Sequence, residues 1–480
     1  MGGSYDHAVT PEEFRAAGHA LVDWIADYRT RVPTLRVQSQ AVPGDISGKM
    51  PGSAPSTPQP FTSLLEDLDR VVVPGVTQVQ HPMHFGWFPS NVSLASVLGD
   101  LASTGIGALG ISWQSAPALT EVEEVVCAWM RDEVGLSDAW HGTIHDTAST
   151  ACMVAMLLAR ERAGGHGQES GGLQALDQPL VVYTSSQAHS SVPKAVLLAG
   201  FGRGNLREID VDPATHAMRP DALAAAIDED AALGRIPAAV VASVGTTATT
   251  AIDPVAPIVA IAQAHDVWVH VDAAMAGSAM LLAEYRPLWD GVEGADSLSW
   301  NPHKWMGTAL DTSLFYVRDV EHLVRVMSTS PSYLRSAADG AVTQYRDWGL
   351  PLGRRFRALK LWFHLHLDGL DAIRERIRRD IENARWLGER VEATPHWRVL
   401  APVNLQTVCV RHEPPGVEGE ALDRHTLAWT DAINRSGQAH LTAACVDGRW
   451  LTRISVGVEA THREHVARVW EMAQQAAGEH

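Results

Sequence analysis

The chain has 480 residues, of which 46 % are hydrophobic and 20 % are charged, so it can bury a substantial core in more than one domain. Its net charge of −18 excludes most nucleic-acid-binding proteins, because no basic stripe is available to neutralise phosphates. No stretch approaches the roughly 18 apolar residues of a membrane span, and no secretory signal is recognisable, so we expect a cytoplasmic protein with no membrane partner.

The first 90 residues are predicted to form a helical segment without a substantial core of its own. A helix should begin after Thr10, because Thr is a favoured N-cap, Pro11 suits the first helical position and Glu13 can complete a capping box. The six prolines between residues 33 and 60 predict an extended connection, and a second helix is expected over 61–72. Such a segment should pack on the main domain or on another chain.

Residues 91–365 are predicted to form a large α/β domain. Short β-branched runs alternate with helical stretches, which is typical of a mostly parallel sheet that is covered on both faces. The expected strands cover residues 180–184, 239–244, 267–271 and 313–317.

The last part of the chain, over 366–480, is predicted to be a smaller α+β domain. A long arginine-rich helix should begin near Arg354, followed by strands within 397–410 and 450–456 and by a C-terminal helix.

One lysine stands out because lysine is rare here: only four of the 38 basic residues are lysine. Lys304 lies in an Asn-Pro-His-Lys-Trp sequence, 32 residues after Asp272, which ends a strand that we expect to be buried. A desolvated lysine can lose its proton and act as a nucleophile, whereas arginine stays protonated. An Asp paired with such a lysine indicates pyridoxal 5′-phosphate (PLP), which needs a Schiff-base lysine and a carboxylate for its pyridine nitrogen.

Several motifs together resemble the group II PLP-dependent decarboxylases and, within them, the aromatic L-amino acid decarboxylases. These motifs cover residues 85–89, 187–191, 270–278, 296–305 and 351–356. The resemblance implies the PLP-dependent transferase fold of type I, as in aspartate aminotransferase, with residues 91–365 as the PLP-binding domain. It also implies a homodimer with active sites at the interface, on whose partner subunit residues 1–90 would pack.

The resemblance implies a role for each matching residue of the cofactor site. Lys304 would bind PLP covalently, Asp272 would pair with the pyridine nitrogen, and His189 and Ala274 would lie on opposite faces of the ring. The remaining cofactor-binding residues would be Thr147, Ala148 and Ser149 at the start of a helix, together with Thr246, Asn301 and His303.

Tyr333 separates two outcomes of the same chemistry. In the family, a tyrosine at this position protonates the substrate carbon after CO2 leaves, whereas relatives with phenylalanine tend to oxidise the amine to an aldehyde. Tyr333 therefore favours decarboxylation to an arylalkylamine over the alternative, an aromatic aldehyde synthase. Its catalytic role would be that of a proton donor, in a segment whose Ser, Gly and Ala content suggests a mobile loop.

The expected substrate pocket is aromatic. By resemblance, Trp87, Phe88 and Pro89 would line it together with His189, and Ile111 and Gly353 would reach in from the partner subunit. A glycine at 353 leaves space for a large ring, which favours a broad aromatic preference that includes tryptophan.

Two residues depart from the family pattern near the phosphate loop: Asp146 stands where Gly is usual, and Thr150 where Glu is common. A carboxylate near a phosphate is unfavourable unless it points away, so a catalytically impaired PLP-binding paralogue stays open as a second alternative. The histidine pairs 141/145 and 81/84 have metal-like spacing without a third ligand nearby, and we expect no metal site.

Overall fold

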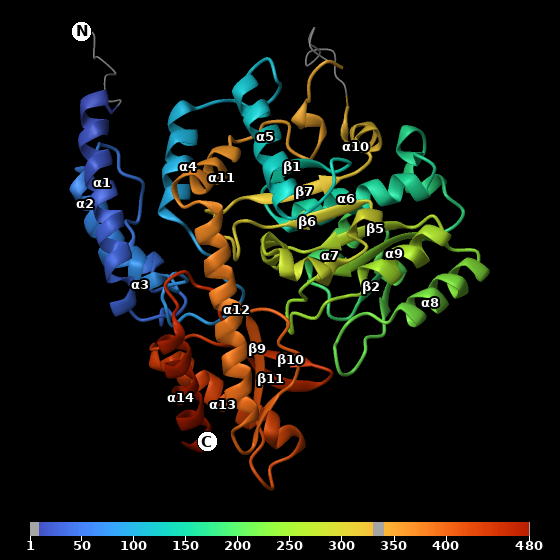
Figure 1. Cartoon of the computed structure of the whole chain (residues 1–480). Helices are drawn as coiled ribbons and strands as arrows, with labels where there is room; N and C mark the ends of the chain where they lie inside the picture. Colours follow the sequence, from blue (N-terminus) through green and yellow to red (C-terminus); the bar gives the residue numbers. More distant parts are fainter. Residues whose placement is uncertain (1–8, 330–339, 480) are drawn as a thin grey trace, which may run out of the picture.

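The computed structural model describes residues 9–329 and 340–479, and a seven-stranded sheet forms its centre (Figure 1). The strand order is β1-β7-β6-β5-β4-β2-β3. Neighbouring strands from β3 to β6 are parallel, whereas β7 runs antiparallel to both β6 and β1. The strands are β1 His141–His145, β2 Leu180–Ser185, β3 Leu206–Ile209, β4 Ile236–Ser243, β5 Trp268–Asp272, β6 Ser297–Trp300 and β7 Ser313–Val317.

All four strands that the sequence predicted in this region are confirmed, with β7 matching its expected bounds. Strands β1, β3 and β6 were not predicted. Each has only four or five residues and none carries a long β-branched run. Every residue of β2, β5, β6 and β7 is buried, as expected for a sheet that is covered on both faces.

Successive residues of one strand enter two different cores. In β2, Leu180 and Val182 pack with α6, α7 and α10, whereas Val181 and Tyr183 pack with α5, α8 and α9. The sheet is thus covered by one helical layer on each face. These helices are α5 Pro117–Glu133, α6 Ala148–Ala163, α7 Ser191–Leu198, α8 Pro220–Ala232, α9 Val255–Ala264 and α10 Val320–Met327.

The prediction of one long helix from Arg354 is wrong, because the structure has two helices there, α11 Ala358–Leu367 and α12 Leu370–Glu392. They are separated at Gly369, whose φ of 76° lies in the left-handed region, which a helix cannot contain. Helix α12 runs from the large sheet to the small one (Figure 1). Its first half packs Ile373 and Ile377 in the large core, and its second half packs Leu387 in the small core.

The C-terminal part forms an antiparallel sheet with the order β10-β11-β9-β8. This confirms the strands predicted within 397–410 and 450–456 and the C-terminal helix, and it adds β10 and α13. The elements are β8 Trp397–Val399, β9 Thr407–His412, α13 Gly419–Ser436, β10 Thr442–Val446, β11 Arg449–Ser455 and α14 Arg463–Glu479.

The N-terminal helices lie side by side at one edge of the molecule (Figure 1). Helix α1 Pro11–Arg31 begins with the predicted capping box, in which Thr10 and Glu13 exchange hydrogen bonds. Helix α2 Phe61–Asp67 continues as a π-helical turn over Leu68–Val72, then α3 Val73–Gly75 and α4 Leu94–Ile106 follow. None of the residues of α1 is buried within this chain. Within the described ranges, no helix is both long enough and apolar enough to span a bilayer.

Candidate active site

A cavity of about 210 Å³ opens at the carboxyl ends of β4, β5 and β6, where ligands bind in open α/β sheets. Its lining includes eleven residues that the sequence singled out. They are Phe88, Thr147, Ala148, Ser149, His189, Thr246, Asp272, Ala274, Asn301, His303 and Lys304.

Asp272 and Lys304 are brought together by the pairing of β5 with β6. Asp272 is the last residue of β5 and lies opposite Ser299 of β6. The pairing continues beyond Asp272, because Ala273 N donates to Ser299 O at 3.0 Å and Asn301 N donates to Ala274 O at 2.9 Å. The Ala274 amide also donates to Asp272 Oδ1 at 3.0 Å, which orients the carboxylate. Burial lowers the pKa of the Lys304 amine, and the Asp272 charge opposes that shift. The site therefore favours a lysine that can release its proton.

His189 lies beside the cavity with a defined hydrogen-bond pattern. Its Nδ1 accepts the Ser191 amide at 3.1 Å and lies 2.8 Å from the Ser191 hydroxyl. Because Nδ1 accepts a backbone N–H, the ring proton of neutral His189 belongs on Nε2. Desolvation lowers the pKa of His189, with the nearby Asp272 raising it and Lys304 lowering it further. The imidazole is thus neutral, with one donor left for a ligand.

An anion-binding cup forms where α6 begins. Thr147 is the N-cap, and the first turn is closed by the amides of Thr150 and Ala151, which donate to Thr147 O at 3.1 Å each. The preceding amides, those of Ala148 and Ser149, belong to the open end of the helix, which attracts anions.

His303 faces this cup from the loop after β6. Its Nδ1 accepts the Thr312 amide at 2.9 Å, so the ring proton belongs on Nε2, and burial lowers the pKa of His303 to about 4. Asn301 is fixed by the Ser313 hydroxyl, which donates to its Oδ1 at 2.6 Å. The neutral side chains of His303 and Asn301 are therefore held in fixed positions beside the N-terminus of α6.

The donor set fits PLP. A phosphate would be held by the α6 amides and His303 Nε2, a pyridine ring would lie between His189 and Ala274 with its nitrogen at Asp272, and Lys304 would take the aldehyde. Ser243, at the end of β4, is a buried residue of the same lining whose Oγ has no hydrogen-bond partner in the described parts of the chain. Five residues of the lining were not predicted from the sequence: Ser191, Ser243, Gly245, Thr247 and Met275. The polar residues that directly follow predicted parallel strands could have indicated some of them.

The expected substrate residues are not all gathered at this cavity. Phe88 lines it, with Lys304 Nζ at 5.5 Å from the ring centroid. Trp87 is 50 % exposed and packs against His440, and Pro89 is buried against Gly457, so neither lines the cavity.

Ile111 and Gly353 lie close together but apart from the cavity of their own chain. Gly110 N donates to Arg354 O at 3.1 Å, which joins the two loops that carry them. Gly353 is exposed, and no residue of either loop lines the cofactor cavity.

The two departures from the family pattern face a different space. Asp146 and Thr150 line a second cavity of about 460 Å³, on the other side of the phosphate loop, together with Arg354 and Arg357. Asp146 Oδ1 accepts the Thr147 amide at 2.8 Å. Asp146 is absent from the lining of the cofactor cavity, so its carboxylate borders the second cavity and not the space expected to hold the phosphate.

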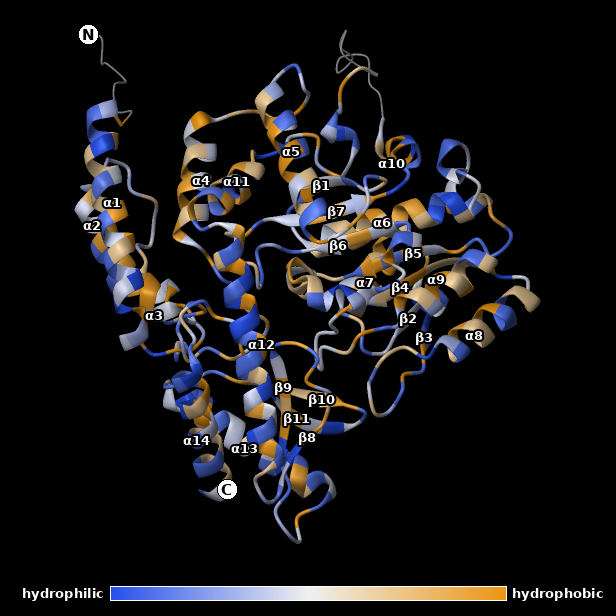
Figure 2. Cartoon of the chain, in the orientation of Figure 1, coloured by the Kyte–Doolittle hydropathy of each residue, from blue (hydrophilic) through white to orange (hydrophobic). Residues whose placement is uncertain are grey.

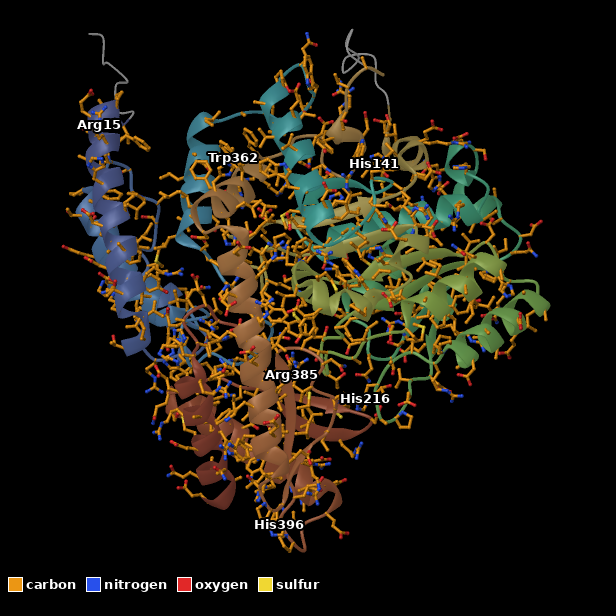
Figure 3. The ribbon with its side chains drawn as sticks, in the orientation of Figure 1. Arg15, His141, His216, Trp362, Arg385 and His396 are labelled. Carbon is orange, nitrogen blue, oxygen red and sulfur yellow. The ribbon has the colours of Figure 1, made fainter. Side chains whose placement is uncertain are left out.

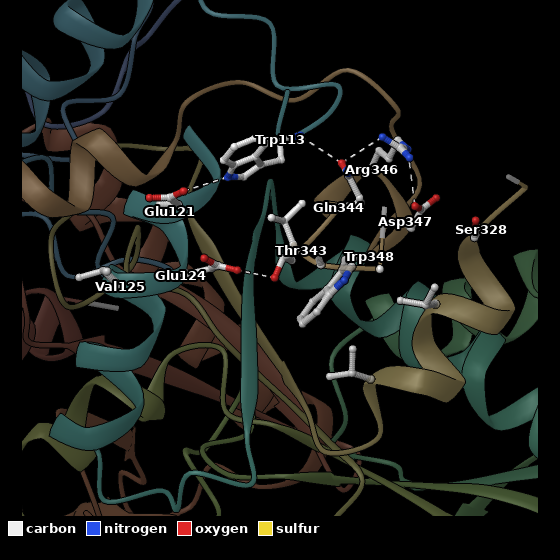
Figure 4. Close-up of a pocket in the computed structure, with 15 residues that line it drawn as sticks. Trp113, Glu121, Glu124, Val125, Ser328, Thr343, Gln344, Arg346, Asp347 and Trp348 are labelled. Atoms are coloured by element: carbon white, nitrogen blue, oxygen red, sulfur yellow. Dashed lines mark hydrogen bonds and ion pairs between the residues drawn. The ribbon is translucent and has the colours of Figure 1, made fainter. Parts of the chain in front are cut away.

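A wider cavity of about 970 Å³ lies between α5, α10 and residues 340–348 (Figure 4). Trp113 Nε1 donates to Glu121 at 2.9 Å, and Thr343 donates to Glu124. Its lining shares no residue with the cofactor cavity. Tyr333 lies outside the described residues, so its position stays a prediction.

No group of three or more His, Cys, Asp or Glu side chains is arranged to hold a metal ion in residues 9–329 and 340–479. Of the histidine pairs with metal-like spacing, His145 is buried and its pKa is lowered to about 3, chiefly by burial. His84 is likewise buried, and its pKa is also lowered to about 3. Both imidazoles are therefore neutral, and both belong to the packed interior.

The comparisons with known proteins agree with this geometry. Residues 43–413 match the model of the pyridoxal-dependent decarboxylase conserved domain. A phenylacetaldehyde synthase of Arabidopsis thaliana is 38 % identical over 475 residues, covering 97 % of this chain and 96 % of the relative. Tryptophan decarboxylase 2 of Oryza sativa subsp. japonica is 37 % identical, covering 99 % and 97 %.

Solved structures show the same fold. The crystal structure of Oryza sativa TDC with PLP and tryptamine superposes with a TM-score of 0.95 at 33 % identity, covering 100 % of this chain and 99 % of that one. Catharanthus roseus tryptophan decarboxylase in complex with L-tryptophan gives a TM-score of 0.92 at 34 % identity, covering 98 % and 99 %. The expected fold type I is confirmed, and the chain belongs to the pyridoxal-dependent decarboxylase family.

Proposed function

We propose that this enzyme removes CO2 from an aromatic L-amino acid of the tryptophan, tyrosine, phenylalanine or DOPA class and releases the arylalkylamine. The observation that carries the proposal is the single cavity in which Lys304, Asp272 and His189 stand beside the aromatic ring of Phe88. Relatives and structural neighbours named for tryptophan, tyrosine and DOPA support the substrate class.

PLP, when bound, supplies the electron sink that accepts the electron pair released as the carboxylate leaves. Lys304 contributes an amine whose lowered pKa leaves Nζ free to exchange with the substrate amine. Asp272, oriented by the Ala274 amide, keeps a proton on the pyridine nitrogen. Asp272 would thus retain a proton on the pyridine nitrogen, while Lys304 can lose the proton of its amine.

The remaining groups orient and protonate. The α6 N-terminus, Asn301 and His303 would hold the phosphate of the cofactor and so fix the orientation in which the substrate is bound. His189 would cover one face of the cofactor ring, and its Nε2 proton is free to donate because Nδ1 accepts the Ser191 amide. Tyr333 then protonates the substrate carbon, directly or through His189.

An aromatic aldehyde synthase stays an alternative function, because relatives with that activity are as similar to this chain as the decarboxylases are. Phenylacetaldehyde synthases of Arabidopsis thaliana and of a Rosa hybrid cultivar are 38 % and 37 % identical to it. Tyr333 favours the decarboxylase. The second alternative, an impaired PLP-binding paralogue, was suggested by Asp146 and Thr150. Both residues line the second cavity and not the cofactor cavity, which supports the active enzyme over this alternative.

We also propose that the enzyme works as a homodimer in the cytoplasm. Outward residues of α4 are apolar, with Leu98, Leu101 and Ile106 between 45 % and 63 % exposed, and Phe14 of α1 is 62 % exposed. Trp362 of α11, the helix packed against α4, is 36 % exposed as well (Figure 3). The hydropathy colouring shows α4 as a largely apolar helix (Figure 2). Exposed large apolar side chains that gather on neighbouring helices are typical of an interface.

Within that dimer, residues 1–90 would pack on the partner, while 91–365 and 366–480 would form the PLP-binding and small domains. Ile111 and Gly353 would then reach the partner's substrate pocket, which explains why they lie apart from the cavity of their own chain. Sedimentation of the PLP-loaded protein should give a dimer, and a monomer with full activity would contradict the shared site.

The function is tested with an amino-acid panel on the PLP-loaded protein, in which CO2, amine, ammonia and peroxide are followed together. Equal amounts of CO2 and amine without peroxide support the decarboxylase and rank the substrates. Ammonia and peroxide in step with CO2 would replace it by the aldehyde synthase. PLP binding without any product from the panel would revive the impaired paralogue.

A further inference from the structure

Segment 85–89, which carries Phe88 into the cofactor cavity, belongs structurally to the small sheet. Phe85 N donates to His440 O at 2.9 Å, and Ser455 N donates to Phe85 O at 2.9 Å. Gly86 fits closely against His440, since a Cβ atom on it would lie 2.5 Å from His440 Nδ1. The segment thus joins the start of β10 to the end of β11, in a sheet that begins more than 300 residues later in the chain.

Within this segment, Trp87 has a backbone conformation that needs support. Its φ of 51° lies in the left-handed region, which bulky side chains rarely adopt. Both of its backbone groups are held by cross-strand neighbours of the small sheet. Trp87 N donates to Thr442 Oγ1 at 2.8 Å, and Trp87 O accepts Arg453 Nη2 at 3.3 Å.

Besides Trp87, Arg453 contacts two elements that border the cofactor cavity. Its Nε donates to Ala248 O at 2.8 Å, in the loop whose residues Gly245, Thr246 and Thr247 line the cavity. Its guanidinium carbon lies 5.1 Å from the centroid of the Phe88 ring, which Lys304 Nζ also faces at 5.5 Å.

Arg453 is buried, with an exposed fraction of 3 %, and no carboxylate among the described residues forms a salt bridge with it. Burial lowers the pKa of Arg453. A buried charge faced only by two carbonyls and an aromatic ring is costly, so its presence here calls for a role that a neutral residue cannot fill.

We propose that Arg453 is a positioning residue of the decarboxylation site: it holds the Trp87 turn and the Phe88 ring against Lys304 and thereby sets the affinity for the aromatic substrate. It does so without lining the cavity itself. A planar fork with several fixed donors can bind two carbonyls and cover a ring at the same time, whereas lysine offers a single point charge. This inference rests on the proposed function, because it assigns Phe88 to the substrate wall.

The test compares Arg453→Gln and Arg453→Lys with Arg411→Gln as the matched control. Arg411 is another buried arginine of the small sheet, and it donates to Asp423 at 2.6 Å away from segment 85–89. For Arg453→Gln we expect the KM for the preferred substrate to rise about tenfold with kcat changed by less than about threefold, which is the signature of lost uniform binding. Arg453→Lys should recover part of this loss, and Arg411→Gln should leave KM unchanged.

A double-mutant cycle with Phe88→Leu separates positioning from direct contact. If Arg453 acts through Phe88, the double variant has about the KM of the worse single variant. If the two effects on KM multiply, Arg453 contacts the substrate independently and the proposal is overturned. Equal losses in kcat for Arg453→Gln and Arg411→Gln, together with a lowered Tm for both, would reduce Arg453 to a general stabilising residue.

A readout without catalysis keeps this inference distinct from the proposed function. Hydrogen exchange of the PLP-loaded protein should be about tenfold faster at segment 85–89 in Arg453→Gln than in the wild type, with exchange in β5 unchanged. Unchanged exchange at 85–89 would contradict the holding role even if the enzyme decarboxylates its substrate. Faster exchange in a protein that decarboxylates no amino acid would leave the holding role intact while the proposed function fails.

Discussion

The two sheets of this molecule contribute different things to one cavity. The large sheet supplies the groups that handle protons and the cofactor, since Asp272 ends β5, Lys304 follows β6 and the anion-binding cup begins α6. The small sheet supplies no lining residue of its own, yet β10 and β11 hold the turn from which Phe88 enters. The residues that carry out the reaction and those that position the substrate wall thus lie on separate elements. Substitutions in the large sheet should therefore lower kcat, and substitutions in the small sheet should raise KM.

The largest effect should come from Lys304→Arg. Arginine keeps the charge but cannot lose its proton, so we expect decarboxylation to fall by about 1000-fold or more and the bound-cofactor absorbance band to disappear. Lys194→Arg, at an exposed position of α7, is the control and should retain wild-type activity. Substantial turnover by the Lys304 variant would break the assignment of chemistry to the large sheet.

A smaller but still large loss is expected for Asp272→Asn. The amide keeps the shape and can keep the contact with the Ala274 amide, but it cannot hold a proton on the pyridine nitrogen. We expect kcat to fall about 100-fold with KM little changed, as measured by steady-state kinetics at saturating PLP. A change confined to KM would assign Asp272 to substrate fit instead.

Acidic pH should lower the folding stability of both the large and the small domain. On the large side the pKa values of His270 and His303 are lowered to about 4, mainly by burial, and beside the small sheet that of His440 is also lowered to about 4. These groups are neutral when folded, whereas the unfolded chain takes up protons as the pH falls below about 6.5. Their stabilisation is therefore complete above about pH 6.5 and is lost toward pH 4.

We expect about 2 kcal/mol less stability at pH 5 than at pH 7 for each fully buried histidine, measured as the free energy of unfolding in urea. His270→Asn should unfold more easily at pH 7 but show a shallower pH dependence. Stability that rises between pH 7 and pH 5 would contradict the neutral state of these side chains.

Gly86→Ala addresses the small sheet alone. The added methyl group would meet the His440 ring, so segment 85–89 must shift and take Phe88 with it. We expect KM to rise about tenfold with kcat nearly unchanged. Gly48→Ala, where a Cβ atom meets nothing within 4 Å, is the control. An equal fall in kcat would show that the two sheets are not separable in function.

The smallest effect is expected for Asp146→Gly, because Asp146 lines the second cavity and not the cofactor cavity. The dissociation constant for PLP and kcat should each change by less than about threefold. A gain of tenfold or more in PLP affinity would mean that the carboxylate repels the phosphate after all.

Much of the large domain could be predicted because its signals are local. Strand β7 is a continuous apolar run between polar residues, and Asp272 ends a strand that its β-branched residues reveal. In the N-terminal segment, the Thr10 cap likewise lies within one turn. The pairing of Asp272 with Lys304 was predicted from the residues themselves, whereas the other members of the site were implied by the family resemblance.

The rest depended on contacts that are distant in sequence. The outward position of Trp87 is set by His440 and Thr442, more than 350 residues later, and no periodicity reveals that pairing. The break at Gly369 was hidden because apolar residues at helical spacing continue on both sides of it. Short strands such as β6 form only because the neighbouring strands β5 and β7 pair with them.

The most direct test of the central claim is to reduce the PLP-loaded enzyme with borohydride and map the modified peptide by mass spectrometry. The chain offers only four lysines, and Lys360, although buried, is paired with Asp100 and Asp311. The account predicts stoichiometric pyridoxyl modification at Lys304 and none at Lys49, Lys194 or Lys360. Modification at any of those three, or a fully active enzyme with Lys304 unmodified, would contradict it.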